Sequence, residues 1–203
     1  MSYISSIRRT PTTMTAAEQT RLLRVSGEHV RGFRDHVIFA VALGTAMREM
    51  EIAALNVGDL FLCGKVRRRM ELRVFKRCGS DPVPQTVFIP DDLAYKLKRF
   101  YSWKRRRGQS LAVDAPLFVS RLKRRIHTRS IRRAFRVWQE RAELDRFFTF
   151  HELRHTALTN VYRATGDIRL TQRVARHKNL NTTTIYAGPS DDDVFTAVRT
   201  LAC

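Results

Sequence analysis

The sequence predicts a mainly α-helical domain with one small antiparallel β-sheet, an α+β fold. Through most of the chain, apolar residues recur every three or four positions, which is the spacing of one helix face. Residues 66–89 instead alternate apolar with other side chains and contain the turn residues Gly79, Pro82 and Pro84. The 203 residues suffice for one ordinary domain with a buried core, and no internal repeat divides them.

Residues 1–14 are expected to form a flexible basic arm, and 15–203 the folded domain. Thr15 and Glu18 have the spacing of a capping box, in which each side chain accepts a hydrogen bond from the other's backbone N–H. The first helix is therefore expected to begin at Thr15 and to end near Val25.

A second helix is expected over 32–46, since it carries apolar residues at every fourth position: Phe33, Val37 and Val41. Arg48 follows at the start of another helix, with Glu51 one turn later on the same face. An arginine at such a place is usually solvated, but apolar residues surround this one in the sequence. We therefore expect Arg48 to be held inward, with Glu51 fixing its guanidinium group.

A two-stranded antiparallel sheet is expected from 66–75 and 86–89, and the first strand places three apolar side chains on one face: Met70, Leu72 and Val74. The loop between the strands begins with Lys76. A loop lysine is more often solvated than catalytic, so the residue pattern leaves both roles open for Lys76.

Further helices are expected over 91–107 and from Arg129, where these residues have core spacing: Leu93, Leu97, Phe100, Ile131, Phe135, Trp138 and Ala142. Residues 150–186 contain two helical segments with histidines, followed by a Thr-rich turn that carries Tyr186. A short amphipathic helix, 191–201, closes the chain.

The charge of the chain indicates a polyanionic partner. Thirty-eight Lys and Arg residues against 19 Asp and Glu give a net charge of +19, which repels itself unless a polyanion binds. Nucleic acid is the favoured partner, and an anionic membrane surface is the main competitor. The basic residues expected to contact phosphates are Arg105, Arg106, Arg107, Arg121, Lys123, Arg124, Arg125, Arg129, Arg132 and Arg133.

The membrane alternative has little support in the sequence. The longest apolar run, 37–43, is much shorter than the roughly 20 residues of a membrane span. Residues 1–13 lack the apolar core of a signal peptide. The cysteines are odd in number and far apart, which fits neither a disulfide framework nor a zinc cluster: Cys63, Cys78 and Cys203. A cytoplasmic protein with reduced thiols is expected.

One short string, His-Glu-Leu-Arg-His at 151–155, supports two incompatible chemistries. His151 and Arg154 lie on one helix face, where an imidazole beside a guanidinium suits a phosphate. The same string satisfies the zinc-protease pattern H-E-x-x-H, with Glu152 as general base and His155 as second ligand. The downstream third ligand of that pattern is absent, and His177 lies beyond a glycine turn. The phosphate chemistry is therefore favoured.

Three blocks in this order resemble the catalytic domain of the tyrosine recombinases, the phage-integrase-like family. Residues 44–59 are similar to the block that contains the family's first catalytic arginine and an acidic residue three positions later. Residues 151–156 match the family's His-x-Leu-Arg-His-Thr, and 177–186 ends in Thr-Thr-Thr-Ile-Tyr like the block that carries the nucleophile. The resemblance covers nearly the whole chain and implies the tyrosine recombinase catalytic-domain fold for 15–203.

The resemblance implies a site-specific recombinase that cuts and rejoins DNA for integration, excision or inversion. Arg48 and Arg154 would clamp the scissile phosphate and stabilise its transition state. Tyr186 would attack phosphorus, forming a 3′-phosphotyrosyl link and freeing a 5′-hydroxyl. His151 would take the phenol proton, and His177 would donate a hydrogen bond to a phosphate oxygen.

Supporting roles follow from the same resemblance. Lys76 would protonate the leaving oxygen, with Lys65 as a distant substitute. Glu51 would orient Arg48 from behind, and His155 would support the site without contacting the phosphate. No metal, ATP or other cofactor is implied, because guanidinium and ammonium groups supply the positive charge.

The chain departs from the family pattern in three places. Met50 stands where a small serine is common, and Ala175-Arg176 precedes His177 where Leu-Gly is usual. Most family members also carry a separate helical DNA-grasping domain before the catalytic one. The chain is expected to be a minimal recombinase or a fragment, and its unusual charge favours the former.

The resemblance also implies partners. Double-stranded DNA is the expected ligand, with a monomer when free and a homotetramer on DNA, in which 191–201 would exchange between subunits or pack on its own core. An accessory recombinase or a host DNA-bending protein, and association with the nucleoid, are further expectations. Three alternatives stay open: a type IB topoisomerase-like relaxer, a non-catalytic DNA-binding regulator of the same fold and, remotely, a zinc peptidase.

Overall fold

The computed structural model describes residues 11–29, 32–72, 85–186 and 198–199. Its helices and strands follow the chain in this order: α1 Ala16–Glu28, α2 Phe33–Thr45, α3 Glu49–Ala54, α4 Val57–Leu60, β1 Phe61–Leu62, β2 Lys65–Val66, β3 Arg69–Leu72, β4 Gln85–Phe88, α5 Asp91–Arg106, α6 Thr128–Arg141, α7 Phe150–Thr165, α8 Ile168–Ala175, and the 3₁₀ turns η1 Leu180–Thr182 and η2 Thr184–Tyr186. The predicted class, mainly helical with small antiparallel sheets, is confirmed.

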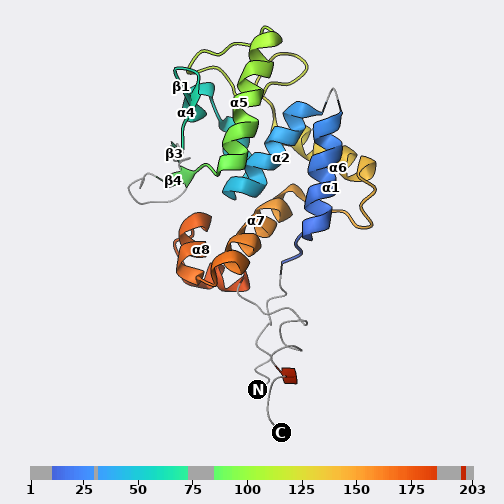
Figure 1. Cartoon of the computed structure of the whole chain (residues 1–203), viewed down its shortest axis with the longest axis vertical. Helices are drawn as coiled ribbons and strands as arrows, with labels where there is room; N and C mark the ends of the chain where they lie inside the picture. Colours follow the sequence, from blue (N-terminus) through green and yellow to red (C-terminus); the bar gives the residue numbers. More distant parts are fainter. Residues whose placement is uncertain (1–10, 30–31, 73–84, 187–197, 200–203) are drawn as a thin grey trace.

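Helix α2 is the central element, with α1 and α5 on either side of it and α7 below it in Figure 1. The sequence predicts one core-facing stripe on this helix, but every residue from 35 to 42 is buried. Neighbours on several sides explain the difference, and the two polar residues of this run, Asp35 and His36, have hydrogen-bond partners in Trp138 and the carbonyl of Leu23. In its last turn Ala42 and Thr45 are buried, so this end of α2 lies within the interior.

Helix α1 begins as predicted. The Thr15 side chain accepts from the backbone N–H of Glu18, and the Glu18 carboxylate accepts from that of Thr15. The helix ends at Glu28, three residues beyond the predicted Val25. Leu22 and Ser26 are buried within it, so packing against α2 and α6 continues past the apolar pattern.

The predicted strand pairing is confirmed, with β3 antiparallel to β4 and Met70 opposite Val87. Met70 and Leu72 are buried, as their alternation requires. A second two-stranded ladder, β1 with β2, was not predicted. Its turn, Cys63-Gly64, has positive φ at both residues, which is the type I′ geometry that favours Asn-Gly or Asp-Gly and is hard to recognise with cysteine first.

The loop after α5 is anchored by Lys104, which is fully buried although the sequence groups it with its basic neighbours. Its ammonium Nζ donates to the carbonyl oxygens of Leu117 (2.9 Å) and Pro116 (3.2 Å) and to Oε1 of Gln109 (3.2 Å). Burial lowers the pKa of Lys104 to about 8. Three oxygen acceptors satisfy the three N–H donors of an ammonium group, so this lysine fastens the loop.

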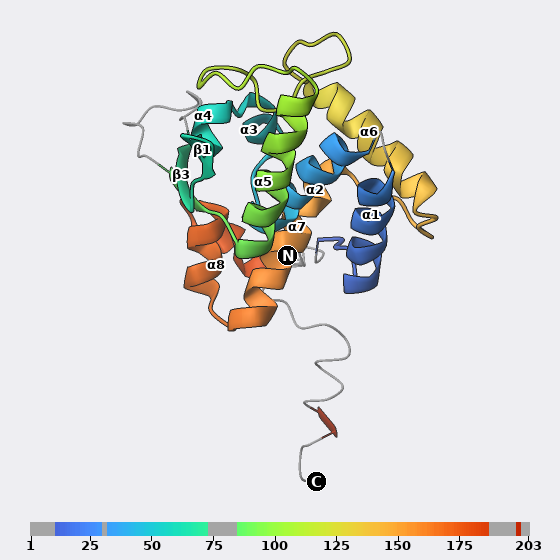
Figure 2. The same ribbon diagram turned by 45° about the horizontal axis from the view of Figure 1, so that its top comes forward.

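Helix α7 lies beneath α2 in Figure 1, and α8 lies beside α7 on the side away from α1 in both views (Figures 1 and 2). A capping box of Thr149 with Glu152 starts α7, and Gly166 ends it with φ of 66°. The Asp167 side chain then caps α8. The turn at Gly166 folds α8 back along α7, which places the residues after α8 near the first turns of α7.

Across the described ranges, none of the helices combines the length and the apolar character that a membrane crossing requires.

Candidate active site

The structure brings the residues of the three sequence blocks together where four helix ends meet. Arg48 precedes α3, directly after the C-terminal end of α2. His151, Arg154 and His155 lie on the first two turns of α7. The remaining residues of the site are those that follow α8: Arg176, His177, Thr183 and Tyr186.

Arg154 is the buried centre of this site, with 3% of its surface exposed. Its Nη1 donates to the carbonyl of Ala46, and its Nη2 donates to the carbonyl of Ala175. These carbonyls are at the C-terminal ends of α2 and α8, where the helix dipole is negative and carbonyls lack partners. The guanidinium therefore joins two helices that are distant in sequence.

The charge of Arg154 is kept in an unfavourable environment. Burial, with the neighbouring charges of Arg48 and Arg176, lowers its pKa to about 10. It remains protonated at neutral pH. A buried cation close to two others attracts an anion strongly, so the site suits a phosphate.

Arg48 is held by Glu51, as predicted. Nη1 of Arg48 donates to Oε1 of Glu51 (2.9 Å), and the Arg48 backbone N–H donates to Oε2 (2.7 Å). The expectation that Arg48 is held inward is wrong, because 41% of its side chain is exposed and Glu51 is the buried partner. The guanidinium has been left accessible because α3 begins at the surface, and only its carboxylate partner reaches the interior.

Tyr186 is enclosed at the end of η2, with 5% of its surface exposed. Its ring packs among four apolar side chains: Ala46, Ala157, Leu158 and Ala175. Its hydroxyl is 2.8 Å from Nδ1 of His155. Burial raises the pKa of the phenol, and the charges of Arg154 and Arg48 act in the opposite direction.

The three histidines of the site are neutral at pH 7. Burial and neighbouring positive charges lower the pKa of His155 and of His177 to about 4. Burial, then the charges of Arg154 and Arg48, also lowers the pKa of His151. The rings of His151 and His155 meet edge to face, with centroids 4.6 Å apart. A neutral imidazole can accept a proton, so each of the three retains the form that a general base requires.

The sequence predicts that His151 receives the phenol proton, but in this structure the phenol contacts His155. His177 is placed by Thr183, whose Oγ1 is 3.1 Å from Nδ1 of His177, while Nε2 lies 3.3 Å from Nη2 of Arg154. Thr183 is fully buried and was missed by sequence reasoning. The sequence feature that could have identified Thr183 is its position in the Thr-rich turn before Tyr186.

Arg176 was also missed as a site residue and noted only as a departure from the family pattern. Its Nη2 donates to Oε2 of Glu51 (2.7 Å), and its side chain is 5% exposed. The sequence feature that could have identified Arg176 is a long cationic side chain at a position where the family usually has glycine. A local pattern could not show that α3, far away in sequence, supplies its partner.

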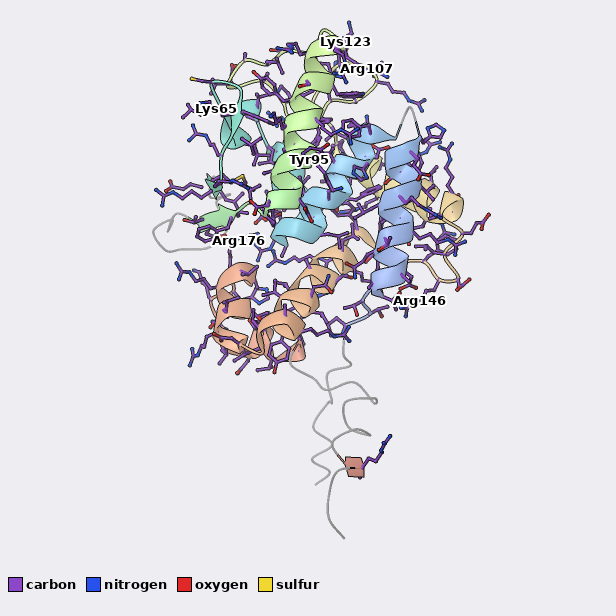
Figure 3. All side chains as sticks on the ribbon, in the orientation of Figure 1. Lys65, Tyr95, Arg107, Lys123, Arg146 and Arg176 are labelled. Carbon is purple, nitrogen blue, oxygen red and sulfur yellow. The ribbon has the colours of Figure 1, made fainter. Side chains whose placement is uncertain are left out.

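The basic clusters at the end of α5 and in the loop before α6 lie apart from this site. Arg107 and Lys123 are at the top of the molecule in Figure 3, whereas Arg176 is at the upper end of α8. These predicted DNA-binding residues are exposed: Arg105, Arg106, Arg107, Arg121, Lys123, Arg124, Arg129, Arg132 and Arg133. Arg132 pairs with Glu49 at 2.9 Å. The structure therefore places them on outer surfaces, and Arg132 contacts the residue next to Arg48.

Arg125 has a structural task. Its Nη1 donates to the carbonyls of Ala54 (2.7 Å) and Leu55 (3.0 Å), and its Nη2 donates to Oδ1 of Asn56. These contacts cap the C-terminal end of α3, the helix that Arg48 precedes. Sequence reasoning groups Arg125 with its basic neighbours, because the distant carbonyls cannot be seen locally.

Several expectations fall outside the described residues. These are the loop position of Lys76, most of the basic arm 1–14, and nearly all of the C-terminal helix 191–201. Lys65, the substitute for Lys76, is exposed on β2.

The zinc-protease pattern is used differently in the fold. The Glu152 carboxylate accepts from the backbone N–H of Thr149 as part of the capping box of α7. His155 points to Tyr186. Among the described residues, no group of three or more His, Cys, Asp or Glu side chains is arranged to hold a metal ion. Helix capping and tyrosine contact therefore account for the two residues that the pattern would use.

Lowering the pH from 7 to 5 is expected to reduce the free energy of unfolding. The folded-state pKa of His155 and of His177 is about 4, below the ordinary value of 6.5. Below pH 6.5 the unfolded chain therefore takes up protons that the folded chain excludes, and stability falls as the pH decreases toward 4. Urea unfolding at several pH values measures this. His155→Gln should make the dependence shallower, and an unchanged dependence would contradict the assignment.

Comparison with known proteins identifies the family of the chain. The model of the phage integrase family matches residues 12–192. The tyrosine recombinase XerC of Vibrio parahaemolyticus is 28% identical over 178 residues, which are 87% of this chain and 54% of the relative. XerC of Haemophilus influenzae is 27% identical over 179 residues, 88% of this chain and 57% of the relative. The chain spans about half the length of these curated relatives.

Solved structures share the fold. The crystal structure of XerA recombinase has a TM-score of 0.76 and 26% identity, and the match covers 96% of this chain and 66% of that one. XerH recombinase, in a post-cleavage complex with its difH substrate, has a TM-score of 0.75 and 19% identity, covering 95% of this chain and 54% of that one. Fold and ordered motifs agree over nearly all of the sequence, and the chain belongs to the phage integrase family. The predicted tyrosine recombinase catalytic-domain fold is confirmed.

Proposed function

We propose that this chain performs the strand cleavage and rejoining of a site-specific DNA recombinase, through a covalent 3′-phosphotyrosyl intermediate. The observation that carries the proposal is the convergence of two guanidinium groups, neutral histidines and one tyrosine at a single site. The charges of Arg154 and Arg48 act to lower the pKa of both Tyr186 and His177, so both guanidinium groups are close enough to affect the tyrosine and the histidine of the site.

The scissile phosphate would bind between Arg48 and Arg154. Arg48 supplies an accessible guanidinium whose contact with Glu51 is made through Nη1, and an arginine carries five N–H donors. Arg154 contributes a charge that is already desolvated, so it strengthens as negative charge develops on the phosphate oxygens. His177 would donate to the same oxygens from Nε2, in the tautomer whose Nδ1 accepts from Thr183, and this hydrogen bond would replace its 3.3 Å contact with Arg154.

In the cleavage step the Tyr186 oxygen would form a bond to phosphorus, and the bond from phosphorus to the 5′-oxygen would break. We assign the phenol proton to His151, which is neutral and is exposed on the same helix face as Arg154. The contact of Tyr186 with His155 would hold the phenol at rest before DNA binds. Lys76 is proposed to protonate the 5′-oxygen, and rejoining would reverse these transfers.

Double-stranded DNA is the proposed substrate, with the exposed basic clusters along its backbone. We further propose a monomer when free, a tetramer on DNA, assistance from an accessory recombinase or a DNA-bending protein, and a place at the nucleoid. The net charge of +19 supports DNA as the substrate. The XerH recombinase structure is bound to a palindromic difH substrate, which supports the same class of ligand here.

DNA affinity is expected to fall steeply with salt. If the basic clusters engage about eight phosphates, the logarithm of the binding constant should decrease with a slope near −7 against the logarithm of salt concentration. Fluorescence anisotropy with a labelled duplex between 50 and 300 mM salt gives this slope. A paired change, Arg121→Gln with Arg124→Gln, should make it shallower by about two. A shallow slope in the unaltered protein would contradict broad phosphate contact.

The proposed function is tested by covalent capture. The protein is incubated in EDTA with a pool of nicked duplexes, randomised around the nick, whose short cleaved strand diffuses away and traps the adduct. A protein–DNA band that resists denaturant supports the proposal, and sequencing the trapped strands identifies the site. No adduct from any sequence would overturn it. If the protein forms an adduct and relaxes supercoiled DNA but exchanges no strands, the topoisomerase-like alternative is favoured. Metal-dependent peptide cleavage would favour the peptidase.

A further inference from the structure

Arg176 occupies the site in a way that the family pattern does not anticipate. It follows α8 with φ of 56°, in the left-handed conformation that glycine adopts freely and other residues do not. Its side chain nevertheless turns inward and is 5% exposed. In Figure 3 it lies at the end of α8 that faces the rest of the molecule. A costly backbone conformation and a buried cation together indicate that this position is used.

The partner of Arg176 is Glu51, which also holds Arg48. Oε1 of Glu51 accepts from Nη1 of Arg48 (2.9 Å), and Oε2 accepts from Nη2 of Arg176 (2.7 Å). One carboxylate is thus divided between two guanidinium groups. A carboxylate with a single arginine commonly forms a two-bonded pair with it. Here Oε2 accepts from both the Arg48 backbone N–H (2.7 Å) and Arg176, so the Arg48 side chain contacts Glu51 through Nη1 and keeps its other donors for a ligand.

Charge balance gives the same result. Glu51 alone would neutralise Arg48, and the pair would attract a phosphate poorly. With Arg176 the three groups carry two positive charges and one negative charge, which leaves one positive charge. The exposures differ accordingly: Arg48 is 41% exposed and can reach a ligand, whereas Arg176 at 5% cannot. Among the described residues, Nε of Arg176 is buried without a hydrogen-bond partner.

We propose that Arg176 is a positioning residue for strand cleavage: by sharing Oε2 of Glu51 with the Arg48 backbone N–H, it gives the three groups a net positive charge and leaves the Arg48 guanidinium available for the scissile phosphate. This inference rests on the proposed function, and it adds a residue that the family motifs do not contain. Because Arg176 directly precedes His177, the same contact ties the His177 segment to α3, so two phosphate-binding groups are positioned relative to each other.

The test uses two variants at position 176 that, like arginine, must adopt the left-handed backbone conformation, and only one of them keeps the positive charge. Arg176→Met removes the guanidinium and retains an unbranched stem, and Arg176→Lys keeps the charge. The adduct rate is measured at saturating protein on the sequence that the unaltered protein selects. Arg176→Met is expected to lower this rate about tenfold, the effect of roughly 1.4 kcal/mol on the barrier, with little change in DNA affinity. Arg176→Lys should recover most of the loss.

A matched control separates this role from loss of charge or of folding. Arg173→Met removes an equal charge from an exposed position on the same helix and should leave the rate unchanged. Arg176→Gly relieves the left-handed backbone and should still be slow, although it folds readily. If Arg176→Gly or Arg176→Met cleaves at the unaltered rate, the inference is wrong while the proposed function stands.

The route through Glu51 is tested by a double-mutant cycle. Glu51→Gln removes the shared carboxylate charge, so Arg176→Met should then cost much less than it does alone. Additive effects would overturn the inference, because they would mean that Arg176 acts independently of Glu51. If the unaltered protein forms no adduct, the proposed function fails and this inference fails with it.

Discussion

Replacing Tyr186 with phenylalanine is expected to abolish the covalent DNA adduct, with a loss of at least about 10⁴-fold in the cleavage rate. The substitution removes the oxygen atom that would bond to phosphorus, and the remaining phenyl ring has no nucleophilic group. The ring would still fill its pocket among Ala46, Ala157 and Ala175. The protein should therefore remain folded and bind DNA as before.

The stability of this variant is a second measurement. Tyr186→Phe loses the hydrogen bond to Nδ1 of His155, which is worth about 1 kcal/mol. Tyr95→Phe is the matched control, because Tyr95 is 64% exposed on α5 and its hydroxyl has no proposed task. The control should form adduct at the normal rate. If Tyr186→Phe retained the adduct, the nucleophile would be another residue.

Replacing Arg154 with methionine is expected to reduce both stability and cleavage severely. The guanidinium satisfies the buried carbonyls of Ala46 and Ala175. Leaving two such carbonyls without donors costs about 2–5 kcal/mol, which is a large share of the free energy of unfolding of a typical domain. Urea unfolding gives this loss, and the trapped adduct should be undetectable even at temperatures where the variant is folded.

Arg154→Lys separates the two roles. Lysine keeps a positive charge but is a single point, and it cannot span two carbonyls that face the two arms of a guanidinium. Part of the stability should return, whereas cleavage should stay low, since the phosphate would lose a planar donor. Equal recovery of both quantities would mean that charge alone matters at this position. A variant Arg154→Met with unchanged stability would contradict the contacts described for Arg154.

Much of the local structure could be predicted from the sequence. The capping box of Thr15 and Glu18, the core faces of α5 and α6, and the β3–β4 ladder all rest on spacings of a few residues. The partnership of Arg48 with Glu51 is also local, because one helical turn separates them. The β1–β2 turn could not be predicted from the residue pattern, because cysteine rarely occupies the positive-φ position that Cys63 takes.

The sequence by itself determined the fold class, the order of the helices and the motif residues that reach the site, because these depend on short-range periodicity and spacing. Only the tertiary structure decided how those residues are used: the carbonyls that Arg154 joins, the contact of Tyr186 with His155, and the sharing of Glu51 by Arg176. The physical reason is that each of these contacts joins segments distant along the chain. Burial and charge at such a junction depend on which helix ends meet there, and no local pattern contains that information.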